Sequence, residues 1–278
     1  DKTILIPCVR VAFPNMCQRF ATSLGYVVFA SMINSLGETS AAAHTIANTV
    51  ESGFYIPGWG MQTAAATLAG NALGAKDWKK LRDLERAIIP LETGLMTVCG
   101  ALLFAFAPQL MTLFSRDAEV IRLGSTVLRM VAISEPFYGI PIVLEGMMQG
   151  VGKTVAPFIF SVIGMWGVRI IGTFICTQLF GMGLIAAWAC MIAHNVLLFV
   201  LFAVYFARGK WKPKFYFSFP TLKAMLPFSL WNLAETLSIW FAGQAGIFIV
   251  SNALSQYYVG LYKTSMSTVN SYMSLITA

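Results

Sequence analysis

Residues 118–149 read AEVIRLGSTVLRMVAISEPFYGIPIVLEGMMQ, an apolar stretch with an acid, Glu135, and two prolines, Pro136 and Pro141, in its second half. A membrane-spanning helix needs about 20 mostly apolar residues, so this stretch is long enough to cross a bilayer. An ionised side chain inside hydrocarbon is costly and persists only where it faces protein or water. The stretch therefore predicts a spanning helix that turns one face toward a polar interior.

Seven more stretches of this kind indicate that the whole chain is built in the same way. They cover residues 6–36, 40–73, 87–114, 154–180, 182–207, 222–254 and 256–278. Apolar residues make up 57% of the 278 residues and charged residues 11%, whereas a soluble domain carries about 25% charged residues. Strands of a membrane barrel would alternate apolar and polar residues, which these stretches do not do. The sequence predicts an all-α polytopic membrane protein with about eight transmembrane helices.

The chain divides after the sixth apolar stretch. We predict a six-helix lobe over 1–210, a basic cytoplasmic linker over 211–221, and the first two helices of a second lobe over 222–278. A Leu-Pro pair at 226–227 opens the seventh stretch much as a Phe-Pro pair at 13–14 opens the first. Weak internal repeats of this size build many secondary transporters. Because the chain starts with Asp and ends inside an apolar stretch, we expect a fragment of a longer transporter.

The net charge of +7 is placed in a way that indicates membrane topology. Basic residues cluster after the second and sixth stretches, at Lys76, Lys79, Lys80, Arg82, Arg86, Arg208, Lys210, Lys212, Lys214 and Lys223. Cytoplasmic loops carry an excess of Lys and Arg. We therefore expect the N-terminus and the even-numbered loops on the cytoplasmic side of the plasma (inner) membrane, and a nucleic-acid partner is not needed to explain the charge.

Motifs for enzyme chemistry are not supported. Residues 150–154 read GVGKT, like the end of a phosphate-binding loop, but Met147 stands where that motif needs its first glycine, and a preceding strand is lacking. The five cysteines and two histidines show no spacing typical of a metal site. We expect no enzyme activity, no cofactor and no bound metal, so transport energy would come from an ion gradient or from a part of the protein outside this sequence.

Several short motifs together resemble one transporter family. They read GETSAAAHTIA at 37–47, PGWGM at 57–61, ATLAGNALGA at 66–75, QGVGKTVAP at 149–157 and GMWGVRI at 164–170. In this combination they resemble the multidrug and toxic compound extrusion (MATE) transporters of the multidrug/oligosaccharidyl-lipid/polysaccharide flippase superfamily, over about residues 5–212. The resemblance implies two six-helix lobes around a cleft, alternating access, and export of organic cations in exchange for Na⁺ or H⁺.

The order of the parts leaves two interpretations open. Residues 5–212 look most like the family's second lobe, whereas residues 219–278 look more like the related saccharide flippases. Either the first block is the N-terminal lobe of a divergent member, or the chain is a fusion or a misjoined fragment.

Five residues are candidates for binding the coupling ion or the substrate: Glu51, Glu135, Tyr138, Arg19 and Arg169. Glu51 lies about 16 Å into its stretch at 1.5 Å per residue, close to the midplane. Burial favours the neutral form of a carboxyl group and a nearby arginine favours the charged form, so such a pair can be switched by conformation. The family's own acids fall near Thr22 and Tyr138, neither of which is acidic here, and Glu135 lies one turn from Tyr138.

A structural interpretation of the same residues is equally open: Glu51 with Arg19, and Glu135 with Arg169, would form buried ion pairs that hold the lobe together. Glu145, nearer the cytoplasmic end, is expected to be structural.

The function that we predict is an ion-coupled secondary antiporter that exports organic cations and drugs. Its partners would be cationic small molecules, membrane lipid and the remainder of the second lobe. The alternatives are a flippase of lipid-linked saccharides, which would need a strongly cationic cleft, and a truncated remnant that transports nothing.

Overall fold

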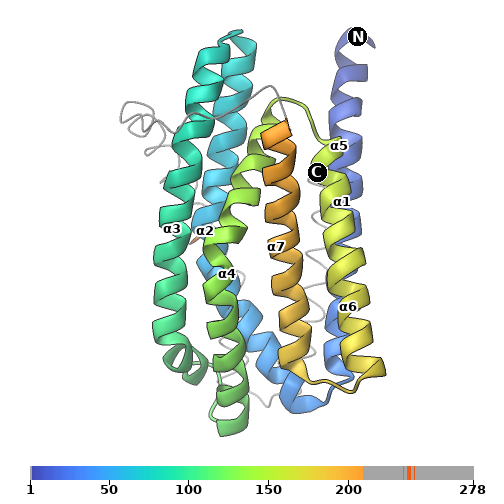
Figure 1. Ribbon diagram of the computed structural model, residues 1–278, viewed down its shortest axis with the longest axis vertical. Coiled ribbons are helices and arrows are strands. Elements are labelled where there is room, and N and C mark those ends of the chain that lie inside the picture. The colour runs from blue at the N-terminus through green and yellow to red at the C-terminus, as the bar shows by residue number, and fades with distance from the viewer. Residues whose placement is uncertain (1, 209–233, 235–236, 239–240, 242–278) are drawn as a thin grey trace.

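The computed structural model describes residues 2–208 together with residues 234, 237, 238 and 241. Residues 2–208 form six long helical segments joined by short turns (Figure 1). The segments are α1 (Lys2–Asn34), α2 (Glu38–Gly74), α3 (Trp78–Thr112), α4 (Ala118–Gly150), a composite fifth helix (Val155–Leu179) and α7 (Leu184–Arg208). The described residues contain no strand, and the predicted all-α class is confirmed. The predicted linker over 211–221, and all but four residues of the two later spans, lie outside the described residues.

Four of the segments are long and apolar enough to cross a membrane: α3, α4, the composite fifth helix and α7. The fifth helix is irregular inside. It runs through α5 (Val155–Val162), the π-helical η1 (Ile163–Ile170), α6 (Ile171–Phe174) and the π-helical η2 (Ile175–Leu179). π-helical turns are rare and are frequent at functional sites, so η1 is a candidate part of one.

α3 begins nine residues earlier than the predicted apolar stretch, at Trp78 and not at residue 87. The side chain of Asp77 caps the helix by accepting a hydrogen bond from the backbone N–H of Lys80, at 2.9 Å. Residues 78–86 are therefore helical although they are strongly charged, because these turns extend past the apolar part of the helix. α4 begins in the same way at Asp117, whose carboxylate accepts from the N–H groups of Glu119 and Val120.

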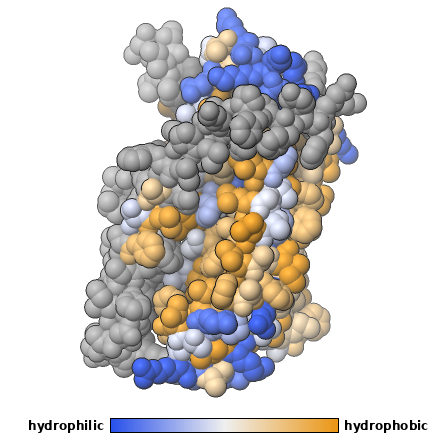
Figure 2. Space-filling model, turned by 90° about the vertical axis from the view of Figure 1, so that its left-hand side faces the viewer, coloured by the Kyte–Doolittle hydropathy of each residue, from blue (hydrophilic) through white to orange (hydrophobic). Residues whose placement is uncertain are grey.

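The helices run up and down, so alternate turns lie at opposite ends of the bundle. The N-terminus, the α2–α3 turn and the α4–α5 turn lie at one end, and the other three turns lie at the opposite end (Figure 1). Figure 2 shows a band of hydrophobic residues on one face, between two ends where hydrophilic residues gather. This is the surface expected of a protein whose waist lies in hydrocarbon.

The interior contains two apolar clusters, one above the other along the bundle. One includes Val50 of α2, Leu103 of α3 and Ala132 of α4. The other lies nearer the end of the bundle that carries the α2–α3 turn and includes Met61 of α2, Ile88 of α3 and Val143 of α4. In each of these three helices a short run of residues separates the two clusters. The acids of the candidate site lie in these runs.

Candidate functional site

An acidic layer lies between the two apolar clusters, near the middle of α2, α3 and α4. It consists of Glu51 on α2, Glu92 on α3 and Glu135 on α4, and their exposed fractions are 3%, 0% and 0%. Each helix also carries a proline close to its acid: Pro57 in α2, Pro90 in α3 and Pro136 in α4. A proline removes one backbone hydrogen bond and leaves a carbonyl oxygen free, so each helix is locally weakened next to its carboxyl group.

Glu51 is held in place by a tyrosine one turn away on the same helix. The hydroxyl of Tyr55 donates a hydrogen bond to Glu51 Oε1 at 2.6 Å. The ring of Tyr55 also packs against the ring of Tyr138 on α4, with centroids 5.1 Å apart. Two tyrosines thus connect the Glu51 carboxylate to α4, and the orientation of Glu51 depends on how α2 and α4 lie against each other.

Glu135 is fully buried, and neither of its carboxylate oxygens has a hydrogen-bond partner among the described residues. It packs against α3 where Gly100 leaves room, because a Cβ added at Gly100 would lie 3.2 Å from the Cβ of Glu135. Glu51 lies close enough to interact with it electrostatically, and the hydroxyl group of Tyr55 also lies near it. A buried carboxylate without a partner is costly, so this group is suited to take up a proton or a cation.

Arg169 enters the same region from η1, the π-helical part of the fifth helix, and is 3% exposed. Its guanidinium lies over two rings of α1, 4.9 Å from the centroid of Tyr26 and 4.2 Å from that of Phe29. It interacts electrostatically with Glu51. Cation–π contacts of this kind stabilise a buried guanidinium without a carboxylate next to it.

Neither of the two ion pairs considered from sequence is present. The ion pairs among the described residues are Arg86–Asp83 and Arg122–Glu119. Arg19 is exposed, and the carboxyl group with which it interacts electrostatically is Glu145. The structure thus brings Glu51, Glu135, Tyr138 and Arg169 into one region and leaves Arg19 outside it.

The sequence of this chain matches that of a known protein family. The sequence model of the MatE family matches residues 14–175, which is more than half of the chain. The chain belongs to the MatE family.

The MatE chain has similar curated relatives in bacteria and in mammals. A probable multidrug resistance protein NorM of Thermotoga maritima is 28% identical over 206 residues, which cover 74% of this chain and 44% of the relative. Multidrug and toxin extrusion protein 2 of Oryctolagus cuniculus is 26% identical over 206 residues, covering 74% of this chain and 34% of the relative. The chain therefore spans less than half the length of these relatives.

Solved MATE structures share the fold. The crystal structure of MATE in complex with MaL6 matches with a TM-score of 0.88 at 18% identity, over 98% of this chain and 61% of that one. The eukaryotic MATE transporter AtDTX14 matches with a TM-score of 0.83 at 17% identity, over 98% and 62% of the two chains. The MatE chain is thus a multi-pass membrane protein with the fold of these transporters.

Two residues of this region of the MatE chain were not among the sequence candidates: Glu92, a member of the acidic layer, and Tyr55, which binds Glu51. Tyr55 was missed because a tyrosine inside an apolar helix is ordinary, although it lies one turn from Glu51. Glu92 was missed although it is an acid inside a predicted span, because it lies only a few residues from the start of that span at residue 87. The extension of α3 back to Trp78 places Glu92 near the middle of the helix.

Glu92 lies at the point where α2, α3 and α4 meet. A Cβ added at Gly58 of α2 would lie 2.9 Å from Glu92 Oε1, and one added at Gly139 of α4 would lie 3.2 Å from the same atom. Neither oxygen of Glu92 has a hydrogen-bond partner among the described residues. The glycines make room for a carboxyl group that the described residues leave unsatisfied.

Glu145, which the sequence predicts to be structural, connects α4 to α1. Its Oε1 accepts a hydrogen bond from Gln18 Nε2 of α1 at 2.8 Å and another from Gln149 Nε2 of α4 at 2.9 Å.

Groups of three or more His, Cys, Asp or Glu side chains able to hold a metal ion do not occur in the part of the chain that the structure describes. The acidic layer has carboxyl and phenol oxygens to offer, which suit a proton or a hard monovalent cation.

Proposed function

We propose that this chain is part of an ion-coupled secondary antiporter that exports organic cations by alternating access, with H⁺ or Na⁺ as the coupling ion. The observation that carries the proposal is Glu135, a fully buried acid near the centre of α4 whose two oxygens lack partners among the described residues. Such residues inside a membrane are costly and mark ion or substrate pathways. The names of the curated relatives, which describe multidrug resistance proteins, support the substrate class.

The coupling would work through competition for the acidic layer. With the coupling ion bound, Glu135 is neutralised and α4 packs closely against α3 at Gly100. When the ion leaves, the charged carboxylate must find water or a cation, which favours a conformation in which the layer opens. The carbonyl group of Ala132, four residues before Pro136, lacks its helical donor and gives α4 a place to bend during this change.

A cationic, aromatic substrate suits the rings next to the layer. Tyr55 packs against Tyr138 and also lies 6.3 Å, centroid to centroid, from Trp59, which is 38% exposed. Phe137, the neighbour of Tyr138, is 48% exposed. Aromatic faces bind organic cations through cation–π contacts, while an acid nearby supplies the opposite charge. In the proposal, the substrate would bind between these rings and a carboxylate of the layer.

The cellular setting proposed is the plasma (inner) membrane, with the N-terminus and the even-numbered loops on the cytoplasmic side. The exposed basic residues at the α2–α3 turn, among them Lys76, Lys79 and Lys80, support this orientation.

The test is energised ethidium efflux from a drug-sensitive, efflux-deficient bacterium that expresses the complete protein containing this chain. Glu135→Gln is compared with wild type at matched membrane abundance. Glu38→Gln is the control, because Glu38 is an exposed acid in the first turn of α2. We expect Glu135→Gln to abolish efflux and Glu38→Gln to keep it.

Two results would count against the proposal. Efflux that survives Glu135→Gln would make Glu135 a structural residue. Absence of wild-type efflux over empty vector, for several cationic dyes, would favour the flippase or the inactive remnant.

A further inference from the structure

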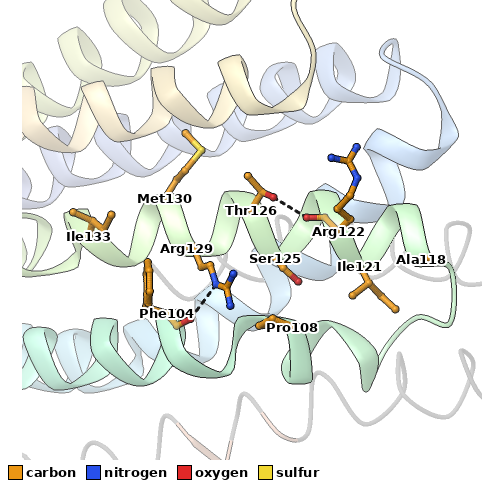
Figure 3. Close-up of a pocket in the computed structure, with 10 residues that line it drawn as sticks. All are labelled: Phe104, Pro108, Ala118, Ile121, Arg122, Ser125, Thr126, Arg129, Met130 and Ile133. Carbon is orange, nitrogen blue, oxygen red and sulfur yellow. Dashed lines mark hydrogen bonds between the residues drawn. The ribbon is translucent and has the colours of Figure 1, made fainter.

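A groove of about 690 Å³ lies between α3 and α4, on the side of the acidic layer toward the α3–α4 turn. Figure 3 shows its lining residues, which come from these two helices alone. On α4 they recur every three or four residues from Ala118 to Ile133, so they form one face of the helix. This face is about 22 Å long at 1.5 Å per residue, somewhat more than the half-thickness of a hydrocarbon core of about 30 Å.

The groove has an apolar floor and two arginines. Phe104, Ile121 and Ile133 line it with apolar surface, and the arginines are Arg122 and Arg129. Arg122 is already neutralised, because its Nε and a terminal nitrogen bind the two oxygens of Glu119 at 3.0 and 2.6 Å. Arg129 forms no ion pair with any residue that the structure describes.

Arg129 is held in the groove by a backbone carbonyl that a proline makes available. Pro108 has no N–H group, so the carbonyl of Phe104, four residues earlier, lacks its helical donor. Arg129 Nε donates to this carbonyl oxygen at 3.4 Å, and its guanidinium lies 5.6 Å from the centre of the Phe104 ring. The side chain is thereby fixed through Nε and one ring contact, which leaves its terminal N–H groups available for an anion.

The depth of Arg129 determines what that anion is. Arg129 lies two turns, about 10 Å, farther into α4 than the exposed Arg122–Glu119 pair near the helix start. Arg129 is also six residues, about 9 Å, from Glu135, so its Cα lies several ångströms inside a hydrocarbon half-thickness of about 15 Å, and its long side chain can reach the headgroup level. A charged side chain without a partner is costly at this depth. At this level the anion that the membrane itself supplies is a lipid phosphate, and guanidinium groups bind phosphate through two parallel hydrogen bonds.

We propose that the α3–α4 groove binds one anionic phospholipid, with its phosphate on Arg129 and one acyl chain along Phe104, Met130 and Ile133. The hydroxyl group of Thr126, which also lines the groove, lies beside the headgroup. The lipid would pack between two helices of the acidic layer, α3 with Glu92 and α4 with Glu135.

The test is lipid retention by the complete protein in mild detergent, measured by native mass spectrometry during titration with dioleoyl phosphatidylglycerol. Dioleoyl phosphatidylcholine has the same chains and phosphate without net negative charge and serves as the reference lipid. We expect Arg129→Gln to weaken phosphatidylglycerol binding about tenfold through loss of the charge-assisted contact. Arg129→Lys keeps the charge and loses the two parallel hydrogen bonds, so we expect its affinity to lie between those of wild type and Arg129→Gln. Arg116→Gln, at an exposed arginine in the same turn region outside the groove, is expected to bind like wild type.

The source of the phosphate is tested by competition. Inorganic phosphate at millimolar concentration is expected not to displace the lipid, because it cannot occupy the apolar part of the groove. If Arg129→Gln does not yield folded protein, Thr126→Trp, at a half-buried position of the lining, fills the groove, keeps both arginines and is expected to reduce binding instead. Equal retention of phosphatidylglycerol by wild type and the groove variants, or displacement by inorganic phosphate, would overturn the proposal.

Discussion

The Tyr55 hydroxyl fixes the Glu51 carboxylate through a hydrogen bond of 2.6 Å. We predict that Tyr55→Phe lowers the free energy of unfolding by about 1–2 kcal/mol, because it removes one bond to an ionisable group in a partly buried site. Thermal unfolding of purified protein in detergent measures this. Tyr205→Phe on α7 is the matched control, since Tyr205 is 39% exposed and its hydroxyl donates to no described residue. An equal loss in both variants would contradict the role of the Glu51–Tyr55 contact.

Glu92 allows a prediction of a different kind, because no basic side chain neutralises it among the described residues. We predict that the free energy of unfolding of Glu92→Gln lies within about 1 kcal/mol of the wild-type value, since an amide has the size of a neutral carboxyl group. Glu92→Ala leaves a cavity between Gly58 and Gly139 and should lower the free energy of unfolding by about 2 kcal/mol or more. Chemical unfolding in detergent would compare the two. Equal destabilisation by both substitutions would mean that Glu92 is needed as an anion.

At the scale of single residues, the sequence predicted the acids better than their partners. Glu51 and Glu135 stood out because a charge in an apolar helix is rare and informative. The partners of the charges could not be inferred, because contact between helices depends on rotation and tilt. Arg169, for example, lies over Tyr26 and Phe29 of α1, whereas Glu135 was the partner considered for it.

At the scale of helices, the α2–α4 contact depends on glycines that allow two backbones to approach. A Cβ added at Gly146 would clash with the carbonyl oxygen of Gln62, and one added at Gly150 would clash with that of Ala66. Gly146 and Gly150 are four residues apart on α4, the spacing that lets membrane helices pack closely.

We predict that Gly146→Ala destabilises the protein by about 1–3 kcal/mol, because the new methyl group pushes α2 and α4 apart at a backbone atom that cannot move alone. Gly94→Ala on α3 is the control, since a Cβ there would meet nothing within 4 Å. Unfolding temperatures in detergent provide the comparison. A Gly146→Ala protein as stable as Gly94→Ala would show that this contact is looser than described.

The six helical segments that the structure describes were predicted to within a few residues except at the start of α3. Apolar length marks the part of a helix that lies in hydrocarbon, so turns beyond it, such as those between Trp78 and Arg86, escape a prediction based on hydropathy. The π-helical η1 was not predicted either, because the sequence around Arg169 has the composition of an ordinary apolar helix.

At the scale of the whole molecule, the turns divide into two sets that should face opposite sides of the membrane. We predict that, in a background without the native cysteines, Lys79→Cys is labelled by a membrane-impermeant maleimide only after cells are opened. Arg116→Cys, near the opposite end of the bundle, should be labelled in intact cells. The reason is the excess of Lys and Arg at the α2–α3 turn. Labelling of Lys79→Cys in intact cells would reverse the orientation.

The central claim is that the acidic layer exchanges a coupling ion for an organic cation. The complete protein would be reconstituted in proteoliposomes, and ethidium movement would be followed after imposing an H⁺ or Na⁺ gradient, for wild type, Glu135→Gln and Glu38→Gln. The account predicts that one of these gradients drives ethidium through wild type and Glu38→Gln, and that Glu135→Gln binds ethidium yet shows no gradient-driven movement. Gradient-driven movement at the wild-type rate in Glu135→Gln would contradict it.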